Sequence, residues 1–239
     1  MPYAFAHPAA VVPLARLLGA RAVPSALAIG SMIPDAWYLV PLLGRDEAHS
    51  VAGALLFCLP AGLAAYAAFH LIFKQPMLAL APRRLAGRLA AWAGPGLPAV
   101  PWAWVLFSLG IGIATHLAWD AFTHAGHIAL VEERVFGVRV HRVLQHASTL
   151  LGSAFLIGWL RRKLAATAPA PVPRGIGERT RVGMLAVLAF IPAVVFGAVL
   201  YTLDAEPLRA ALRAAGVTAF CAFGLIAVLF CIAWRRGLA

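Results

Sequence analysis

Charged residues are scarce in this chain of 239 residues: they make up 12% of it, while 62% is hydrophobic. The mean hydropathy is +0.85. Soluble domains carry roughly 25% charged residues, so the composition excludes a soluble domain. It indicates an integral membrane protein, and no other class fits it.

Cysteine is scarce as well. The three cysteines, Cys58, Cys221 and Cys231, lie inside apolar runs, and none is in a CxxC pair. This pattern argues against a disulfide framework or a thiolate zinc site, and it predicts small hydrophobic side chains in packed helices. The N-terminal stretch MPYAFAHPAAVVPL has no basic residue ahead of its apolar part, so we do not expect a cleaved signal peptide.

Long apolar runs are what the sequence does have. A helix needs about 20 residues to cross a bilayer, and five segments reach or approach this length. We expect the third to begin before His146, and Pro60 and Pro192 to kink their helices. Small residues in AGLAAYAA and GIGIA predict close helix contacts. The five segments are 51–73, 101–119, 147–160, 182–203 and 217–234.

Acidic residues number nine against twenty lysines and arginines, and the positive excess lies on one side of this topology. The loops 74–100 and 161–181 and the tail 235–239 contain twelve lysines and arginines but one acid, Glu178, which accounts for the whole net charge of +11. The positive-inside rule makes this side, and with it the C-terminus, cytoplasmic. Because topology explains the basic charge, we do not expect nucleic-acid binding.

The first fifty residues predict a helical hairpin rather than a full span. Segments 8–18 and 22–33 would each be about 16 Å long, half of a hydrocarbon core. The hairpin is either re-entrant or interfacial, with both ends on the outer side, and the charge of Arg21 at its tip favours the interfacial form. A full span at 22–42 is the alternative.

The predicted fold is therefore an all-α, polytopic membrane bundle of about five transmembrane helices with an N-terminal re-entrant or interfacial hairpin. Residues 1–160 form a membrane-embedded domain, and residues 161–180 form a cytoplasmic linker that is rich in proline. Residues 181–239 form a C-terminal transmembrane hairpin.

Histidine and aspartate gather at one membrane face of this topology. The stretch ATHLAWDAFTHAG carries His116, Asp120 and His124 at intervals of four, which places them on one face of a helix. Ionisable groups at a membrane are costly and mark functional sites. The candidate metal ligands at this face are His7, Asp35, His49, His116, Asp120, His124 and His146.

These residue types point to metal chemistry. Neutral imidazole and carboxylate groups suit zinc, iron or manganese. Several ligands of both kinds predict more than one ion, with Asp120 as the natural bridge. A bound ion lowers the pKa of its water to about 7, so we expect a hydrolase that uses metal-bound hydroxide, with Asp35 and Asp120 as its catalytic carboxylates.

Two other interpretations stay open. The cluster could be non-catalytic and serve helix packing or partner binding. Alternatively, His116 and Asp120 could form a proton relay in a transporter. A relay needs a polar path toward the cytoplasm, and Ser108 and Thr115 are the only hydroxyl side chains between 101 and 115.

Five motifs in order over most of residues 1–155 carry a resemblance: MPYAFAHPAAVVPL, GSMIPDAWYL, GRDEAHS, ATHLAWDAFTHAG and LQHAS. In them the chain resembles an uncharacterised bacterial family of multi-pass membrane proteins, the domain of unknown function family 4184. This family is distantly similar to inner-membrane metal-dependent hydrolases. More remotely, it is similar to zinc-dependent phospholipase C and the P1-type nucleases, all-α enzymes that cleave phosphate esters at three zinc ions.

The resemblance implies that all seven residues are ligands, that the divalent metal is zinc, and that a lipid or envelope phosphate ester is the substrate at the cell membrane. Two departures concern the number of ions. The zinc enzymes use their N-terminal tryptophan as a ligand, whereas six residues precede His7. Their last histidine is followed four residues later by an acid, whereas His146 is followed by Leu150. We therefore expect one or two ions.

Overall fold

A computed structural model describes residues 4–38, 43–124, 128, 131, 133–135, 137–172, 174–203 and 207–238. His127 and part of the alternative span 22–42 lie outside these residues. Apart from loops, the described chain consists of helices and one antiparallel hairpin of strands β1 (Arg134–Val135) and β2 (Val138–Arg139). The all-α prediction is confirmed.

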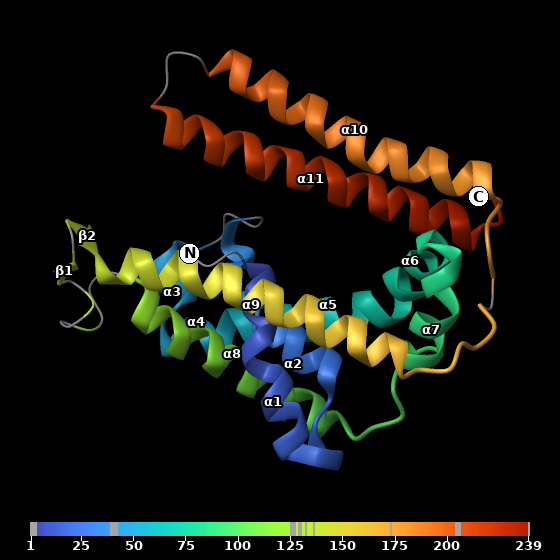
Figure 1. The fold of residues 1–239 in the computed structure, drawn as a ribbon, viewed down its shortest axis with the longest axis horizontal. Helices are drawn as coiled ribbons and strands as arrows, with labels where there is room; N and C mark the ends of the chain where they lie inside the picture. The colour runs from blue at the N-terminus through green and yellow to red at the C-terminus, as the bar shows by residue number, and fades with distance from the viewer. Residues whose placement is uncertain are drawn as a thin grey trace. The chain divides into compact units, whose positions relative to one another are not determined.

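Five helical segments of the described chain are long and apolar enough to cross a membrane, as predicted. The first, Val51–Leu80, is built from several shorter helices. The third begins at Val140, ahead of His146, as expected. The others are α8 (Trp102–Thr123), α9 (Val140–Ala165), α10 (Glu178–Thr202) and α11 (Leu208–Arg235). Figure 1 shows all four of these single helices.

Two π-helical stretches interrupt the first segment. It runs through α4 (Val51–Gly53), π-helix η4 (Ala54–Cys58), α5 (Leu59–Ala68), π-helix η5 (Phe69–Phe73) and α6 (Lys74–Leu80). Each π stretch ends shortly before a proline, Pro60 or Pro76. A proline ring clashes with the carbonyl four residues earlier, and in both cases that carbonyl lies in the π stretch. The wider π turn accommodates the clash.

The predicted N-terminal hairpin is present. It consists of α1 (Pro8–Leu18), the 3-10 turn η2 (Gly19–Arg21) and α2 (Pro24–Gly30). Each helix starts with a proline, whose fixed φ suits the first helical position. Gly19 ends α1 with a φ of +56°, which favours glycine. The 3-10 turns η1 (Ala4–Ala6) and η3 (Ile33–Tyr38) flank the hairpin, and α3 (Arg45–Ala48) follows it.

The hairpin lies alongside α8 rather than beyond its end. The Val23 amide donates over 3.0 Å to the hydroxyl of Ser108, the seventh residue of α8. The guanidinium of Arg21, at the tip, lies 5.7 Å from the ring centre of Trp104, near the start of the same helix. The hairpin and α8 therefore lie side by side along a large part of α8, which is itself a candidate span. This overlap favours the re-entrant form, and the contact with Trp104 gives the charged tip a partner.

Close backbone contact joins α2 to α8. A β-carbon at Gly30 would lie 2.4 Å from the Leu109 carbonyl oxygen, and one at Gly112 would lie 2.4 Å from the Leu27 carbonyl oxygen. Only glycine permits this approach at both positions. The small-residue pattern GIGIA thus makes the predicted close contact, through Gly112.

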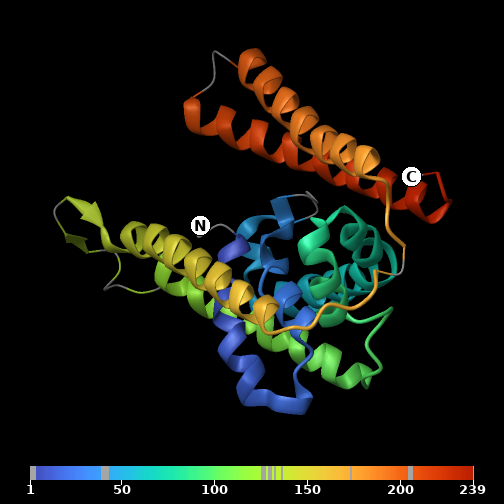
Figure 2. The ribbon, with the colours of Figure 1, turned by 45° about the vertical axis from the view of Figure 1, so that its right-hand side comes forward.

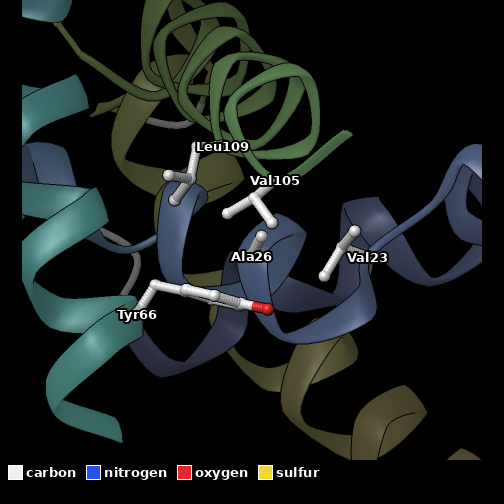
Figure 3. Close-up of a cluster of buried hydrophobic side chains, with 5 residues drawn as sticks. All are labelled: Val23, Ala26, Tyr66, Val105 and Leu109. Atoms are coloured by element: carbon white, nitrogen blue, oxygen red, sulfur yellow. The ribbon is translucent and has the colours of Figure 1, made fainter. Parts of the chain in front are cut away.

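A small apolar cluster fills the space between the hairpin, α5 and α8 (Figure 3). Val23 and Ala26 come from the hairpin, Tyr66 from α5, and Val105 and Leu109 from α8. All five are buried. This packing fixes the rotation of α8 and therefore the direction in which its polar end points.

By its contacts the chain divides into two units. The first contains Met1–Ala67 and Pro98–Lys163, and the second contains Ala68–Leu97 and Leu164–Ala239. In the second unit α10 and α11 lie side by side (Figures 1 and 2). Residues 68–97, including α7 (Arg83–Ala93), thus group with the C-terminal hairpin. All six candidate ligands outside α9 belong to the first unit.

The proline-rich linker is held along α7. One guanidinium nitrogen of Arg88 donates to the carbonyls of Leu164, Ala165 and Thr167 over 2.7–2.9 Å, which satisfies carbonyls at the end of α9. The Ala170 amide donates to the Gly87 carbonyl over 2.9 Å. The predicted linker 161–180 therefore has fixed contacts, and its described residues between α9 and α10 form no helix.

The helix contact generates a test. We expect Gly112→Ala to lower the free energy of unfolding by about 1–3 kcal/mol, the range for overpacked interiors, because the new β-carbon would displace the α2 backbone. Gly110→Ala is the matched control, since nothing lies within 4 Å of a β-carbon there. Thermal unfolding in detergent measures both variants. Equal midpoints for the two would contradict the close contact.

Candidate metal centre

Six of the seven candidate ligands come together at one end of α8. His116 and Asp120 lie on α8, and His124 follows its last residue. Asp35 lies in the turn η3, directly after the hairpin. The other two, His7 and His49, stand at the start of α1 and the end of α3.

His116 is fully buried, and the hairpin fixes its ring. Its Nδ1 lies 2.8 Å from the carbonyl oxygen of Ser31, at the end of α2. A carbonyl only accepts hydrogen bonds, so Nδ1 carries a proton and donates it. In the neutral ring the lone pair is then on Nε2, which faces the other candidate ligands.

The same arrangement recurs at His49. Its Nδ1 donates to the Arg45 carbonyl over 2.9 Å, which leaves the lone pair on Nε2. The two Nε2 atoms of His49 and His116 lie 3.2 Å apart. Two lone pairs at this distance repel each other unless a proton or a metal cation lies between them. Backbone hydrogen bonds of this kind orient metal-binding histidines in proteins.

Asp120 is at the centre of the cluster. One of its oxygens, Oδ2, lies 3.3 Å from His49 Nε2, 3.7 Å from His116 Nε2 and 3.4 Å from His124 Nδ1. The other, Oδ1, lies 3.8 Å from His7 Nε2. The carboxylate therefore faces four imidazoles, with a different oxygen toward His7 than toward the others.

Burial sets the ionisation of two histidines of the cluster, His7 and His124, called the outer histidines below. Burial, and then the neighbouring His116, lower the pKa of His7 to about 3. Burial also lowers the pKa of His124 to about 4, against the opposing charge of Asp120. The ring of His7 stacks on that of His116 with centres 3.9 Å apart. Both outer histidines are neutral at pH 7, which is the state that binds a metal.

Asp35 faces the two histidines His49 and His116. Its Oδ1 lies 3.8 Å from His116 Nε2 and 3.9 Å from His49 Nε2. Burial raises the pKa of Asp35 above its ordinary value, with His116 opposing the change. The cluster thus contains two buried carboxylates in different environments.

Several ligand-type atoms of the cluster have no hydrogen-bond partner among the described residues. They are His7 Nε2, Asp35 Oδ1, Asp120 Oδ1 and His124 Nε2, and all are buried. Unpaired buried polar atoms cost free energy and are rare in native proteins. Four of them in one cluster, all of types that bind transition metals, fit a metal centre.

The ligand atoms form two overlapping groups, each within 4.8 Å. One contains His7, His116 and Asp120, and the other contains Asp35, His49 and His116. His116 Nε2 has a single lone pair and can bind one cation only. The two oxygens of Asp120 face different histidines, Oδ1 toward His7 and Oδ2 toward His49.

His146 is not brought into the cluster. It lies on α9 with an exposed side chain and belongs to neither ligand group. His141 is buried, and its Nδ1 donates to the Val131 carbonyl over 3.2 Å.

Arg45 contacts the cluster although it was not among the candidate residues. Its Nη2 lies 3.2 Å from Asp120 Oδ2, which makes it a direct partner of the central carboxylate. The signal was its place four residues before His49 in GRDEAHS, one helical turn from a candidate ligand.

Comparison with known proteins bears on the family alone. The profile described as a domain of unknown function (DUF4184) matches residues 1–233. No curated protein and no solved structure matches the chain. The expected likeness to phospholipase C and P1-type nucleases thus has no support from these comparisons, whereas the resemblance to the uncharacterised family is confirmed: the chain belongs to the DUF4184 family.

Proposed function

We propose that this multi-pass membrane protein binds a divalent metal and hydrolyses a phosphate ester. The observation that carries the proposal is a set of four buried ligand atoms that make no hydrogen bond within the described chain, beside two imidazole nitrogens 3.2 Å apart. Mixed imidazole and carboxylate ligands favour zinc, with iron and manganese as alternatives. The proposed ligands are His7, Asp35, His49, His116, Asp120 and His124.

The metal supplies Lewis acidity and an activated water at neutral pH. The protein's own residues prepare the site for it. The Ser31 and Arg45 carbonyls hold His116 and His49 in the tautomer that presents Nε2. Asp120 faces the four imidazoles and would be the carboxylate shared by the ions if two were bound. Asp35 faces His116 Nε2 over 3.8 Å and His49 Nε2 over 3.9 Å, and we assign it the acid–base role.

The charge distribution supports an outer-face location for this site. Twelve lysines and arginines lie on the opposite side of the predicted topology, which the positive-inside rule makes cytoplasmic together with the C-terminus. The substrate would then be a phosphate ester of a lipid or an envelope polymer. We do not propose a nucleic-acid partner.

The transporter alternative finds little support in the hydroxyl groups of α8. The Ser108 hydroxyl accepts a hydrogen bond from the Val23 amide. The hydroxyl of Thr115 donates to the Gly112 carbonyl over 2.7 Å. Both groups serve local structure, and no other hydroxyl side chain lies on α8 between Trp102 and Thr115. A cluster that serves helix packing alone would not explain why four buried ligand atoms make no hydrogen bond among the described residues.

Metal content tests the first half of the proposal. We expect protein purified in detergent without chelator to hold one or two divalent ions per chain, measured by plasma mass spectrometry. His116→Ala should lose most of this metal, because His116 belongs to both ligand groups. His146→Ala, in an exposed position, is the control and should retain it. A metal-free wild-type protein that cannot be loaded with zinc would end the proposal.

Hydrolysis tests the second half. We expect zinc-loaded protein to hydrolyse bis(p-nitrophenyl) phosphate, with chelator abolishing the reaction. Asp35→Asn should lower kcat by a factor of about 10²–10⁴, the usual contribution of an acid–base group. If the variant holds its metal and keeps full activity, Asp35 has no catalytic role. If metal-loaded wild-type protein is inactive on phosphate esters, the cluster is structural or binds a partner.

Proton binding gives a third test, on metal-free protein. The pKa values of His7 and His124 lie below the ordinary 6.5, so the unfolded chain binds protons between about pH 4 and 6.5 that the folded chain does not. Stability is therefore complete above pH 6.5 and falls as pH is lowered through this window. Each imidazole contributes up to about 1.4 kcal/mol per pH unit.

The experiment compares unfolding midpoints at pH 7, 6 and 5 in the presence of chelator. His7→Phe keeps an aromatic ring against His116 but cannot bind a proton, so its midpoint should fall less with pH than that of the wild type. Asp35, with a raised pKa, acts in the opposite direction in both proteins and cancels in the difference. Parallel curves would show that His7 is not buried in its neutral form.

A further inference from the structure

The guanidinium of Arg45 occupies an unusual position at the centre's edge. Its Nη2 contacts Asp120 Oδ2 at 3.2 Å, while its Nη1 lies 3.6 Å from the fully exposed Asp46. The side chain of Arg45 is 24% exposed. This is more than that of any other group paired with Asp120 in the described structure. The side chains of those partners, His7, His49, His116 and His124, are 0–16% exposed. Arg45 is therefore the partner of Asp120 with the greatest access to solvent.

The backbone fixes this position. Arg45 is the first residue of α3, and its carbonyl accepts the hydrogen bond from His49 Nδ1 over 2.9 Å. Residue 45 is thus tied directly to a proposed metal ligand. The Arg45 side chain therefore extends from a backbone position that lies beside the centre.

The charges of the site show why metal binding would weaken the ion pair between Arg45 and Asp120. Asp35 and Asp120 bring two negative charges, and Arg45 is the permanently charged cation that contacts Asp120. A divalent cation held by the same carboxylates would neutralise both of them. The guanidinium would then be left with one net positive charge at the edge of the site, and its N–H donors would be free for another anion.

We infer that Arg45 binds the anionic oxygens of the substrate's phosphoryl group. This inference rests on the proposed function and names the part of the substrate that the site recognises. A guanidinium presents several N–H donors in a planar fork that matches two phosphoryl oxygens. Neutral esters and cationic substrates would gain nothing from it. The phosphoryl group can belong to a lipid headgroup or to a soluble phosphate ester.

Phosphate binding tests this role without relying on turnover. The full-length protein in detergent is loaded with cobalt, whose visible absorption reports changes at the metal, and is titrated with inorganic phosphate. We expect Arg45→Met to raise the Kd for phosphate at least tenfold, equivalent to about 1.4 kcal/mol, with unchanged cobalt content. Arg45→Lys should lie between the two. The matched control is Arg16→Met, which removes one exposed positive charge from α1 and should bind phosphate like the wild type.

Each other result is decisive. If Arg45→Met holds cobalt and binds phosphate like the wild type, the inference is wrong and the metal centre stands. If Arg45→Met loses its cobalt, Arg45 is a structural counter-ion of Asp120. If the wild type binds no cobalt, the proposed function fails and the inference fails with it. A parallel titration with short-chain phosphatidic acid identifies the source: tighter binding than inorganic phosphate indicates a lipid, and weaker binding indicates a soluble ester.

Discussion

The close approach of α2 to α8 is the constraint on which the centre depends. Gly30 and Gly112 allow the two backbones to touch, and as a result the Ser31 carbonyl reaches Nδ1 of His116 at 2.8 Å. That hydrogen bond sets the tautomer of the imidazole common to both ligand groups. A β-carbon at either glycine would separate the helices and withdraw the carbonyl. Glycines that look like packing residues in the sequence therefore also determine the chemistry of His116.

Desolvation makes the polar groups of the cluster costly to bury. Carboxylates and imidazoles placed among apolar helices lose hydration, and partners must compensate for that loss. Asp120 obtains such partners from four histidines and Arg45. Even so, one of its oxygens and one of Asp35 have no hydrogen-bond donor among the described residues. A structural cluster would gain stability by removing these atoms, whereas a centre that binds a cation needs them. Local destabilisation of this kind is typical of functional sites.

Local regularities made much of this arrangement predictable. Hydropathy and length predict the five spans because a bilayer imposes both, and the interval of four residues places His116 beside Asp120 because helix periodicity is local. The periodicity of α8 carries no information about His7, Asp35 and His49. Their convergence on α8 could be predicted only from the membrane topology and the family resemblance. Arg45 could not be distinguished from a solvated residue, because the sequence does not say what faces it. The order of the motifs placed His146 among the ligands, but the structure leaves its side chain exposed on α9.

The direction of α8 explains why cations suit this end of the bundle. Carbonyl groups at the C-terminal end of a helix carry a partial negative charge, which favours cations and disfavours carboxylates in the last turn. Asp120 lies in the last turn of α8, which ends at Thr123. Its negative charge therefore adds to the field of the helix instead of opposing it. Arg45 offsets part of this field, and its exposed position makes it an exchangeable partner. In the proposed site, a divalent cation bound to Asp120 would offset more of this field, and Arg45 would then be available for the proposed contact with an anion.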